Sequence, residues 1–412
     1  MIEFSPDGEL MNRLFRTPAF TLALVTLTLF TDMAVYDLVI PFLPQYAGPW
    51  LSGESELGLL FGTYALALLA SLPFTGRITD RYTPRRALLL GCAGLLATLL
   101  LYSLANGRIL LIAARMIQGV SGGITWTAGL AQLASIFPVD QRGKSLGVAM
   151  TGMSLGTLVG PPLGGILFDS LGGRWPFILV AIWVSLLLIG LMVLLPRKRV
   201  THASETVLPR RERWKPYFGT AIFVVLGATF LSCLEPTLPL NLQQRLGSSP
   251  STVGLLFGLA ALVYGIISPV AGFLADRVGN RRTMLFGLFS CAVTLPLVAI
   301  PTSVVGESFT LIAFGASCSL LLTPTLPEFA VISERHGKGT LGSAYSLFNF
   351  VYAFGMAIGP ILAGLLEPLF GLPSTLGIIG IASLGVLVLF RQRISTPDTR
   401  TPPVWSKNTA ER

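Results

Sequence analysis

The chain has 412 residues, of which 52% are apolar and only 12% are Asp, Glu, Lys or Arg. Soluble globular proteins carry about 25% charged residues, so this composition excludes a disordered chain, a disulfide scaffold and a soluble multidomain enzyme. The formal net charge is +9, which taken alone suits nucleic acid or acidic lipid as a partner. The apolar residues occur in unbroken blocks and do not alternate, which favours membrane-spanning helices over a barrel.

Twelve apolar runs follow one another along the chain, each near the length of about 20 residues that a helix needs to cross a bilayer. They lie at residues 19–45, 57–76, 87–105, 108–137, 143–168, 175–195, 217–241, 252–275, 283–300, 307–330, 340–366 and 373–390. A polar connection at 196–216 separates six runs from six. The sequence therefore predicts an all-α integral membrane protein with 12 transmembrane helices, arranged as two pseudo-symmetric six-helix bundles at 19–195 and 217–390, with tails at 1–18 and 391–412. No short apolar region with a cleavage site precedes the first run, so we expect that helix to be retained.

The 29 Lys and Arg residues are divided unequally between the two sides of the membrane. The tails and the alternate connections on their side hold 25 of them, whereas the other side holds Arg108, Arg174 and Arg245. Cytoplasmic loops are enriched in Lys and Arg, so both termini are predicted to be cytoplasmic. The basic charge is thus assigned to topology and to contact with anionic lipid, and nucleic acid is excluded as a partner.

Three motifs recur in the two halves at a nearly constant offset. Pro41-x-x-Pro44 in the first half corresponds to Pro236-x-x-Pro239 in the second half, and Gly160-Pro161 corresponds to Gly359-Pro360. A loop motif follows the second and the eighth span, and its members are Gly76, Asp80, Arg81, Arg85 and Arg86 in the first copy and Gly272, Asp276, Arg277, Arg281 and Arg282 in the second. Duplicated six-helix bundles are typical of transporters that work by alternating access, with the binding site between the halves.

The loop motif is predicted to act in gating. Each copy holds an Asp beside several Arg residues, whereas anchoring to lipid would need no acid. We expect charge pairs across the cytoplasmic face that form in one closed state and break as the halves rock. Plain electrostatic anchoring is the alternative interpretation.

Four ionisable residues lie well inside the predicted spans, Asp32, Asp37, Arg115 and Glu235, and Glu328 lies near a helix end. Such residues are costly in a membrane and are by default candidates for function. Asp32, near the middle of the first span, is expected to be a counter-ion for a cationic substrate or a proton carrier, with a structural pair to Arg115 as the alternative. Glu235 precedes Pro236, which loosens the helix there, and is expected to exchange a proton for substrate, with a polar helix cap as the alternative.

Helix geometry predicts the direction and depth of Asp37, and charge predicts what kind of partner Arg115 has. Asp37 follows Asp32 by about 7.5 Å along the helix and about 140° around it, so the two carboxylates cannot point at one spot. Asp37 and Glu235 lie equally far into helices that run in the same direction, which predicts similar depths. Arg115 keeps its proton and needs an acidic or carbonyl partner, for which Asp32, Asp37 and Glu235 are the candidates.

Small residues and aromatic rings complete the candidate machinery. Glycines about four residues apart line one helix face, which predicts close packing and hinging at Gly156, Gly160, Pro161, Pro162 and Gly164 in the fifth span and at Gly359 and Pro360 in the eleventh. Tyr36, Tyr64 and Trp126 are expected in the wall of the cavity, where aromatic rings suit organic cations.

Catalytic, metal and cofactor sites find no support in the sequence. The four cysteines lie in apolar runs without CxxC spacing, the two histidines lie in polar connections, and no GxxxxGK[ST] motif occurs. We expect no enzymatic activity, no metal, no cofactor and no pumping by ATP.

These motifs resemble the signatures of the major facilitator superfamily over essentially the whole chain. They are the two GxxxDRxxxRR loops, Arg115-Met-Ile-Gln118-Gly119, and Gly156-x-x-x-Gly160-Pro161-Pro162-x-Gly164-Gly165, the last being typical of drug:proton antiporters. Two stretches, Asp32-Met33…Pro41 and Leu234-Glu235-Pro236-x-x-Pro239, look like vesicular amine transporters in particular. The resemblance implies that Asp32 contacts a substrate amine and that Arg115 tunes a proton-carrying acid.

The chain departs from the amine carriers at three charged positions. Asn349 stands where those carriers have a coupling acid, Tyr64 replaces a lysine, and Leu322 lies where the tenth span carries an acid. The departures imply a more apolar cavity with one or two acids.

We therefore predict a multi-pass transporter, a monomer, that exports a small lipophilic or cationic organic compound in exchange for protons. A facilitator or proton symporter of a polar nutrient and a non-transporting membrane receptor are the alternatives. The plasma membrane is the expected location, with a vacuole or vesicle as alternatives.

Overall fold

Helices form almost all of the chain that the structure describes. The computed structural model describes residues 17–195, 214–336 and 341–389, and all structural statements concern these residues. The first range contains α2 (Pro18–Leu38), α3 (Leu43–Ala47), η1 (Gly48–Trp50), α4 (Glu54–Tyr82), α5 (Pro84–Leu104), α6 (Arg108–Ile136), α7 (Val139–Leu171) and α8 (Trp175–Leu194). The others contain η2 (Lys215–Tyr217), α10 (Phe218–Leu246), α11 (Pro250–Val278), α12 (Asn280–Leu297), α13 (Val304–Leu322), α14 (Thr325–His336), α15 (Leu341–Phe370) and α16 (Leu372–Leu389).

Within the described ranges, ten helical segments are long and apolar enough to cross a membrane. The predicted span 283–300 is outside that set and corresponds to α12, which begins with the polar residues Asn280, Arg281 and Arg282. The predicted span 373–390 corresponds to α16, whose qualifying apolar stretch, Leu372–Val386, is shorter. Every predicted span thus falls on helix, and the predicted all-α membrane architecture is confirmed.

Two predicted spans are interrupted at prolines. The first ends as α2 at Leu38 and resumes as α3, because Pro41 lacks the N–H that a continuing helix would need. The tenth divides into α13 and α14 on either side of Thr323-Pro324. In contrast, Pro236 and Pro239, which match Pro41 and Pro44 in the sequence repeat, lie inside the unbroken α10. The two halves therefore differ at this pair.

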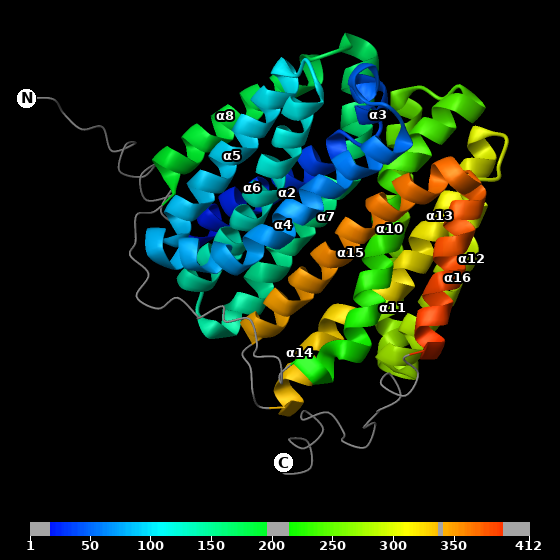
Figure 1. The fold of residues 1–412 in the computed structure, drawn as a ribbon. Helices are drawn as coiled ribbons and strands as arrows, with labels where there is room; N and C mark the ends of the chain where they lie inside the picture. Colours follow the sequence, from blue (N-terminus) through cyan, green and yellow to red (C-terminus); the bar gives the residue numbers. More distant parts are fainter. Residues whose placement is uncertain (1–16, 196–213, 337–340, 390–412) are drawn as a thin grey trace, which may run out of the picture.

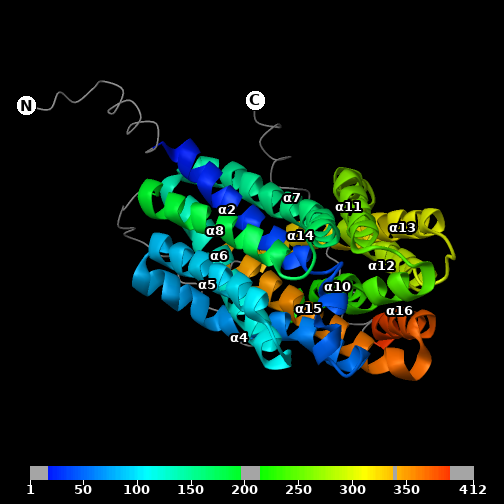
Figure 2. The same ribbon diagram turned by 90° about the horizontal axis from the view of Figure 1, so that it is seen from above.

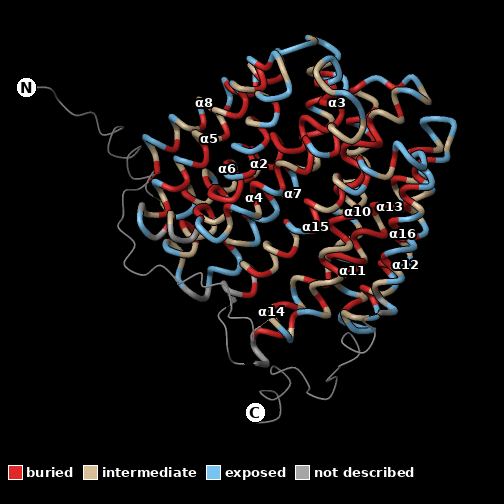
Figure 3. Tube along the Cα trace, viewed as in Figure 1, coloured by how far each residue is buried: buried red, intermediate tan, exposed pale blue. Residues whose placement is uncertain are grey.

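The helices pack as two groups. In the N-half, α2 lies along α7, α6 lies between α4 and α5, and α5 also packs on α8. In the C-half, α10 lies along α15, while α13 packs on both α11 and α12 and α12 packs on α16. Each half encloses its own apolar core, and red stretches follow the inner faces of both groups in Figure 3. Most of the linker 196–216 and of both tails lies outside the described residues, so the predicted domain boundaries remain predictions.

The halves meet through two pairs of helices, α7 on α11 and α4 on α15 (Figures 1 and 2). We call the end of the molecule that carries α3 the α3 end, and the opposite end, which carries α14, the α14 end. At the α3 end the Ser55 hydroxyl donates to the carbonyl of Gly364 at 2.8 Å. Gly165 faces the carbonyl of Pro250 so closely that a Cβ there would collide with it. The α3 end is therefore sealed by backbone-to-backbone contact.

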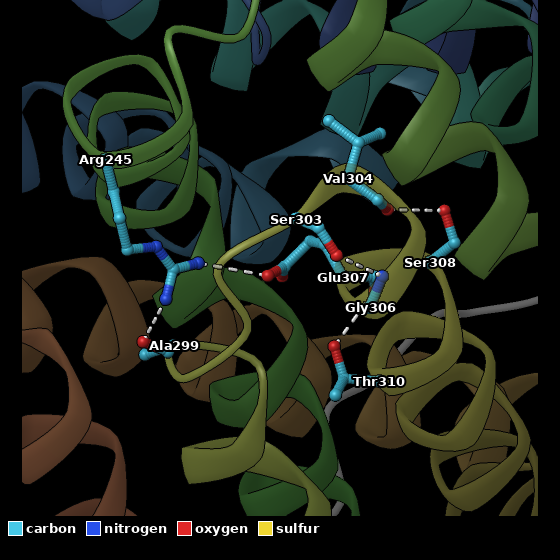
Figure 4. A network of polar contacts seen from close by, with 8 residues as sticks. All are labelled: Arg245, Ala299, Ser303, Val304, Gly306, Glu307, Ser308 and Thr310. Carbon is cyan, nitrogen blue, oxygen red and sulfur yellow. Dashed lines mark hydrogen bonds and ion pairs between the residues drawn. The ribbon is translucent and has the colours of Figure 1, made fainter.

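A polar network holds the C-half together at the α3 end (Figure 4). Arg245, in the last turn of α10, donates to the Glu307 carboxylate at 3.0 Å and to the carbonyl of Ala299. Glu307 lies in the first turn of α13 and is fully buried. Ser303 caps the same helix by accepting from the N–H of Gly306 at 3.1 Å. The network thus fixes α10 against the loop between α12 and α13.

Candidate functional site

A tyrosine and a glutamate link the two halves inside the predicted membrane region. Tyr36 of α2 places its hydroxyl 2.9 and 2.8 Å from the two carboxylate oxygens of Glu235 on α10. Both side chains are buried. Glu235 sits directly before Pro236 in a helix that stays continuous. This contact joins the carboxyl group of one half to the phenol of the other.

Asp32 is held within the N-half. The indole N–H of Trp126 on α6 donates to Asp32 Oδ2 at 2.9 Å. Gly122, one turn earlier on α6, leaves room beside this bond, since a Cβ there would lie 3.0 Å from the Tyr64 hydroxyl and 3.4 Å from Asp32 Oδ2. The three predicted wall residues are therefore all near an acid, and the Tyr36 and Tyr64 rings pack on each other with centroids 4.3 Å apart.

Asp37 is buried beside the contact between Tyr36 and Glu235. Its Oδ2 atom has no hydrogen-bond partner among the described residues. The Thr157 hydroxyl of α7 hydrogen bonds to the carboxyl group, and Glu235 is close enough to interact with it electrostatically. The similar depths that the sequence predicts for Asp37 and Glu235 agree with this proximity.

Arg115 corrects one expectation. It is fully buried, yet it forms no ion pair within the described ranges, so the expected pairing with Asp32, Asp37 or Glu235 is absent from this structure. Its guanidinium donates to the side-chain carbonyl of Gln118 at 3.2 Å and lies 4.6 Å from the centroid of the Phe61 ring. Arg115 Nε and Nη2 have no hydrogen-bond partner among the described residues, because aromatic donors hold two of the acids, Asp32 and Glu235.

Two further predicted positions lie in the C-half. Asn349 on α15 is half-buried and has no hydrogen bond to another described residue. Leu322 is buried at the end of α13, where it packs against Gly227 of α10. Asn349 forms no hydrogen bond with Asp32, Asp37 or Glu235 in this structure, so its part in the site stays a prediction.

The loop motif is only partly described, because the side chains of Gly76 and Asp80 lie outside what the structure describes. Arg85 donates to the carbonyls of Leu195 and Met192 at 2.9 and 2.6 Å, so it caps the end of α8 within its own half. Arg81 and Arg86 are exposed.

In the second copy, Arg277 lies over the Phe273 ring at 4.2 Å. Asp276 is exposed and forms no ion pair with another described residue, and Arg282 is also exposed. Arg281 is half-buried, and its Nε has no hydrogen-bond partner. Arg85 thus contacts α8 of its own half, and Asp276 forms no ion pair within the described ranges, so charge pairing between the halves stays a prediction.

The predicted packing residues line helix contacts. Gly156, Gly160 and Gly164 face the backbone of α2, and Gly359 faces α10. Pro161 and Pro162 face Gly254 and Gly258 of α11, and the carbonyl of Pro360 faces Gly58 of α4. The glycines thus lie mostly within a half, whereas the prolines lie at the contact between halves.

Sequence reasoning missed one contact at the α3 end. Asp169, in the last turn of α7, accepts from the N–H of Ser251 at 2.8 Å and also from its hydroxyl. A carboxylate of the N-half thereby caps the first turn of α11 in the C-half. The only signal in the sequence is an Asp close to the end of a span, which many exposed helix ends share.

Comparisons with known proteins agree with this arrangement. The Major Facilitator Superfamily profile matches residues 22–234 and again 220–411. The synaptic vesicular amine transporter of Rattus norvegicus is 28% identical over 341 residues, which cover 81% of this chain and 65% of that protein. The chain therefore spans less than two thirds of the length of that relative. The "MFS-type transporter SLC18B1" of the same species is 29% identical over 404 residues, covering 92% of this chain and 87% of that protein.

Among solved structures, a bacterial homologue of the human lysosomal transporter Spinster, in an inward-facing and unoccupied conformation, superposes with a TM-score of 0.74. The two are 15% identical, and the match covers 92% of this chain and 96% of that one. The duplicated profile, the helical halves and the signature motifs lead to one conclusion: the chain belongs to the major facilitator superfamily of membrane transporters and is similar to vesicular amine transporters.

Proposed function

We propose that this transporter is a proton-coupled antiporter that exports a small lipophilic organic cation by alternating access. The proposal rests on one observation. Two carboxyl groups from different halves, Asp32 and Glu235, are buried in the predicted membrane region and are each held by an aromatic donor. Neither forms an ion pair with Arg115, so a cationic substrate can compete for them without displacing an arginine.

The surrounding rings support an organic cation as the substrate. Tyr36, Tyr64 and Trp126 stand next to the two acids, and aromatic faces attract ammonium groups, the more strongly where water is excluded. The names of the amine-transporting relatives agree with this substrate class. A polar nutrient would favour a cavity rich in amide side chains, and the half-buried Asn349 is the single amide among the candidate site residues.

The uneven distribution of charge gives the orientation within this proposal. The sequence assigns 25 of the 29 Lys and Arg residues to the tails and to alternate connections, and the described helices that lead into them end at the α14 end, which favours a cytoplasmic α14 end. The sealed α3 end then faces outwards, and the structure corresponds to an inward-facing state. We propose the plasma membrane as the location and a monomer as the transporting unit, with a vesicle membrane as the alternative that the relatives support.

Transport into vesicles tests the proposal. Purified protein is reconstituted with a pH-sensitive dye inside, a proton gradient is imposed, and lipophilic cations, neutral drugs and sugars are added in turn. We expect a cation to dissipate the gradient with wild-type protein and not with Glu235→Gln, while Asp32→Asn weakens the response at low cation concentration. Glu56→Gln, an exposed acid paired with Arg108, is the control and should behave like wild type.

Two outcomes would overturn the proposal. If a compound crosses down its own gradient and moves no protons, the protein is a facilitator and the acids serve binding alone. If only a sugar or another polar nutrient responds, the substrate class is wrong.

A further inference from the structure

We infer that Tyr36 is the residue that ties the protonation of Glu235 to the closing of the α3 end. The inference rests on the proposed proton coupling and adds to it a partner for the carboxyl group. Tyr36 belongs to the N-half and Glu235 to the C-half, so their contact can exist only while the halves are together. We call this contact the α2–α10 clasp.

The geometry of the clasp accommodates a protonated glutamic acid. The phenol oxygen lies 2.9 and 2.8 Å from the two carboxylate oxygens, which is hydrogen-bonding distance for both. A phenol has one O–H to donate, and an ionised carboxylate has none. When Glu235 carries a proton, the phenol donates to one oxygen and the carboxyl O–H donates back to the phenol, so both short contacts become hydrogen bonds.

The surroundings of the clasp disfavour the ionised form in the closed state. Tyr36 is 6% and Glu235 7% exposed, and a buried carboxylate without an ion pair is costly. Asp37, next to Tyr36 on α2, adds a second acid that interacts with Glu235, while Arg115 opposes it from α6 without forming an ion pair. The titratable and charged groups facing Glu235 come from five helices and are Tyr36 and Asp37 on α2, Tyr64 on α4, Arg115 on α6, Cys233 on α10 and Tyr352 on α15.

These contacts define a transport cycle in which one proton is exchanged for one substrate cation. With the α3 end open, Glu235 is separated from Tyr36 and takes one proton from water on that side. The clasp then forms and the α3 end closes. At the α14 end, one substrate cation replaces the proton on Glu235, and the proton leaves to water on that side. The ionised carboxylate now holds the cation in place of the phenol, so the clasp is broken and the α3 end can open again.

The distance across the α3 end shows whether the two halves are closed there, and it therefore tests the role of the clasp. Spin labels on Asn106→Cys and Thr302→Cys occupy exposed positions at the α3 end of the N-half and the C-half, and the four native cysteines are buried. Double electron–electron resonance of the reconstituted protein, without substrate, then gives the closed fraction at each pH. We expect closure to increase as the pH falls.

Three variants separate the clasp from simple packing. Glu235→Gln keeps a partner for Tyr36 and carries no charge, so it should stay closed at every pH. Tyr36→Phe keeps the ring against Tyr64 and loses the hydroxyl, so the ratio of closed to open protein at low pH should fall roughly three- to tenfold. The double variant should be no more closed than Tyr36→Phe alone, which is the non-additivity expected of residues in contact.

The matched control is Tyr46→Phe. The Tyr46 hydroxyl donates to the carbonyl of Tyr102 at 2.7 Å, also near the α3 end but within the N-half. This variant should close as wild type does, and thermal unfolding of every variant checks that each is folded. If Tyr36→Phe closes to the same extent as wild type at low pH, the clasp is overturned even where antiport is observed. If closure follows the predicted pattern and no cation exchanges for protons, the clasp stands and the proposed function fails.

Discussion

At the scale of single residues, the candidate site holds its acids with neutral donors. Trp126 donates to Asp32 and Tyr36 contacts Glu235, while the one buried arginine bonds to Gln118. An arginine paired with a carboxylate forms a strong charge-assisted bond that a substrate would have to break. A neutral indole or phenol is displaced more easily, which suits a site that must both bind and release a cation.

Removing one indole N–H tests how Asp32 is positioned. Trp126→Phe keeps an aromatic ring and removes the donor to Asp32, and hydrogen bonds to charged groups contribute about 1.5–3 kcal/mol. We expect the apparent KM for a transported cation to rise about tenfold, with the maximal rate changed less. Initial rates of uptake into vesicles over a range of cation concentrations give both constants.

A second tryptophan provides the control for that experiment. Trp183 on α8 donates to the hydroxyl of Thr31 at 3.1 Å, one residue before Asp32 on the same helix. Trp183→Phe therefore removes a comparable bond to α2 without touching the acid. An equal rise in KM for both variants would contradict a positioning role for Trp126 and point to a general loosening of α2.

At the scale of elements, two adjacent glycines of α7 face different partners. A Cβ on Gly164 would collide with the carbonyl of Leu38 on α2, within the N-half. A Cβ on Gly165 would collide with the carbonyl of Pro250 at the start of α11, in the other half. A methyl group added at Gly164 should therefore affect folding, whereas one added at Gly165 should affect the contact between the halves.

We predict that Gly164→Ala and Gly165→Ala separate these effects. Gly164→Ala should reduce stability, since overpacking costs typically 1–3 kcal/mol, and should leave the closed fraction unchanged. Gly165→Ala should open the α3 end, because opening relieves its collision. The resonance distance across the α3 end and the melting temperature are measured for both.

The control for both glycines lies on the same helix. Gly147 of α7 has nothing within 4 Å of an added Cβ, so Gly147→Ala should change neither quantity. If Gly165→Ala lowers only the melting temperature, the contact between α7 and α11 does not govern closure.

The sequence was sufficient to predict the long helices and insufficient to predict which side chains contact one another. Apolar runs and charges located the long helices, because a membrane imposes the length of each span and leaves few alternatives. The break after Leu38 was missed, since the apolar run continues through Pro41 and Pro44 while the helix does not. The acids were found because charges are rare in such spans, but the partners of Arg115 depend on side-chain geometry that spacing does not encode.

At the scale of the whole molecule, alternating access requires each half to move as a body. The contacts between halves run along α7 and α11 and along α4 and α15, with close backbone approach at glycines and single polar bonds such as Asp169 to Ser251. The contacts within a half must be stronger if rocking is not to distort it. The network around Glu307 has that role in the C-half, where it joins α10, the loop after α12 and the start of α13 at the rim that closes.

This difference predicts that ion pairs at the same end of the molecule have unequal effects on stability. Arg245 and Glu307 are 3.0 Å apart with Glu307 fully buried, so Arg245→Ala leaves a carboxylate without its partner, which costs about 3–5 kcal/mol. Arg108 and Glu56 are 3.3 Å apart on the surface of the N-half, where an ion pair contributes about 0–1 kcal/mol. We therefore expect Arg245→Ala to lower the melting temperature of the purified protein by roughly 5–10 °C and Arg108→Ala by about 2 °C or less. The double variant Arg245→Ala/Glu307→Gln should recover part of the loss, because it removes the unpaired charge. Equal shifts for the two single variants would show that the network around Glu307 does not hold the C-half together.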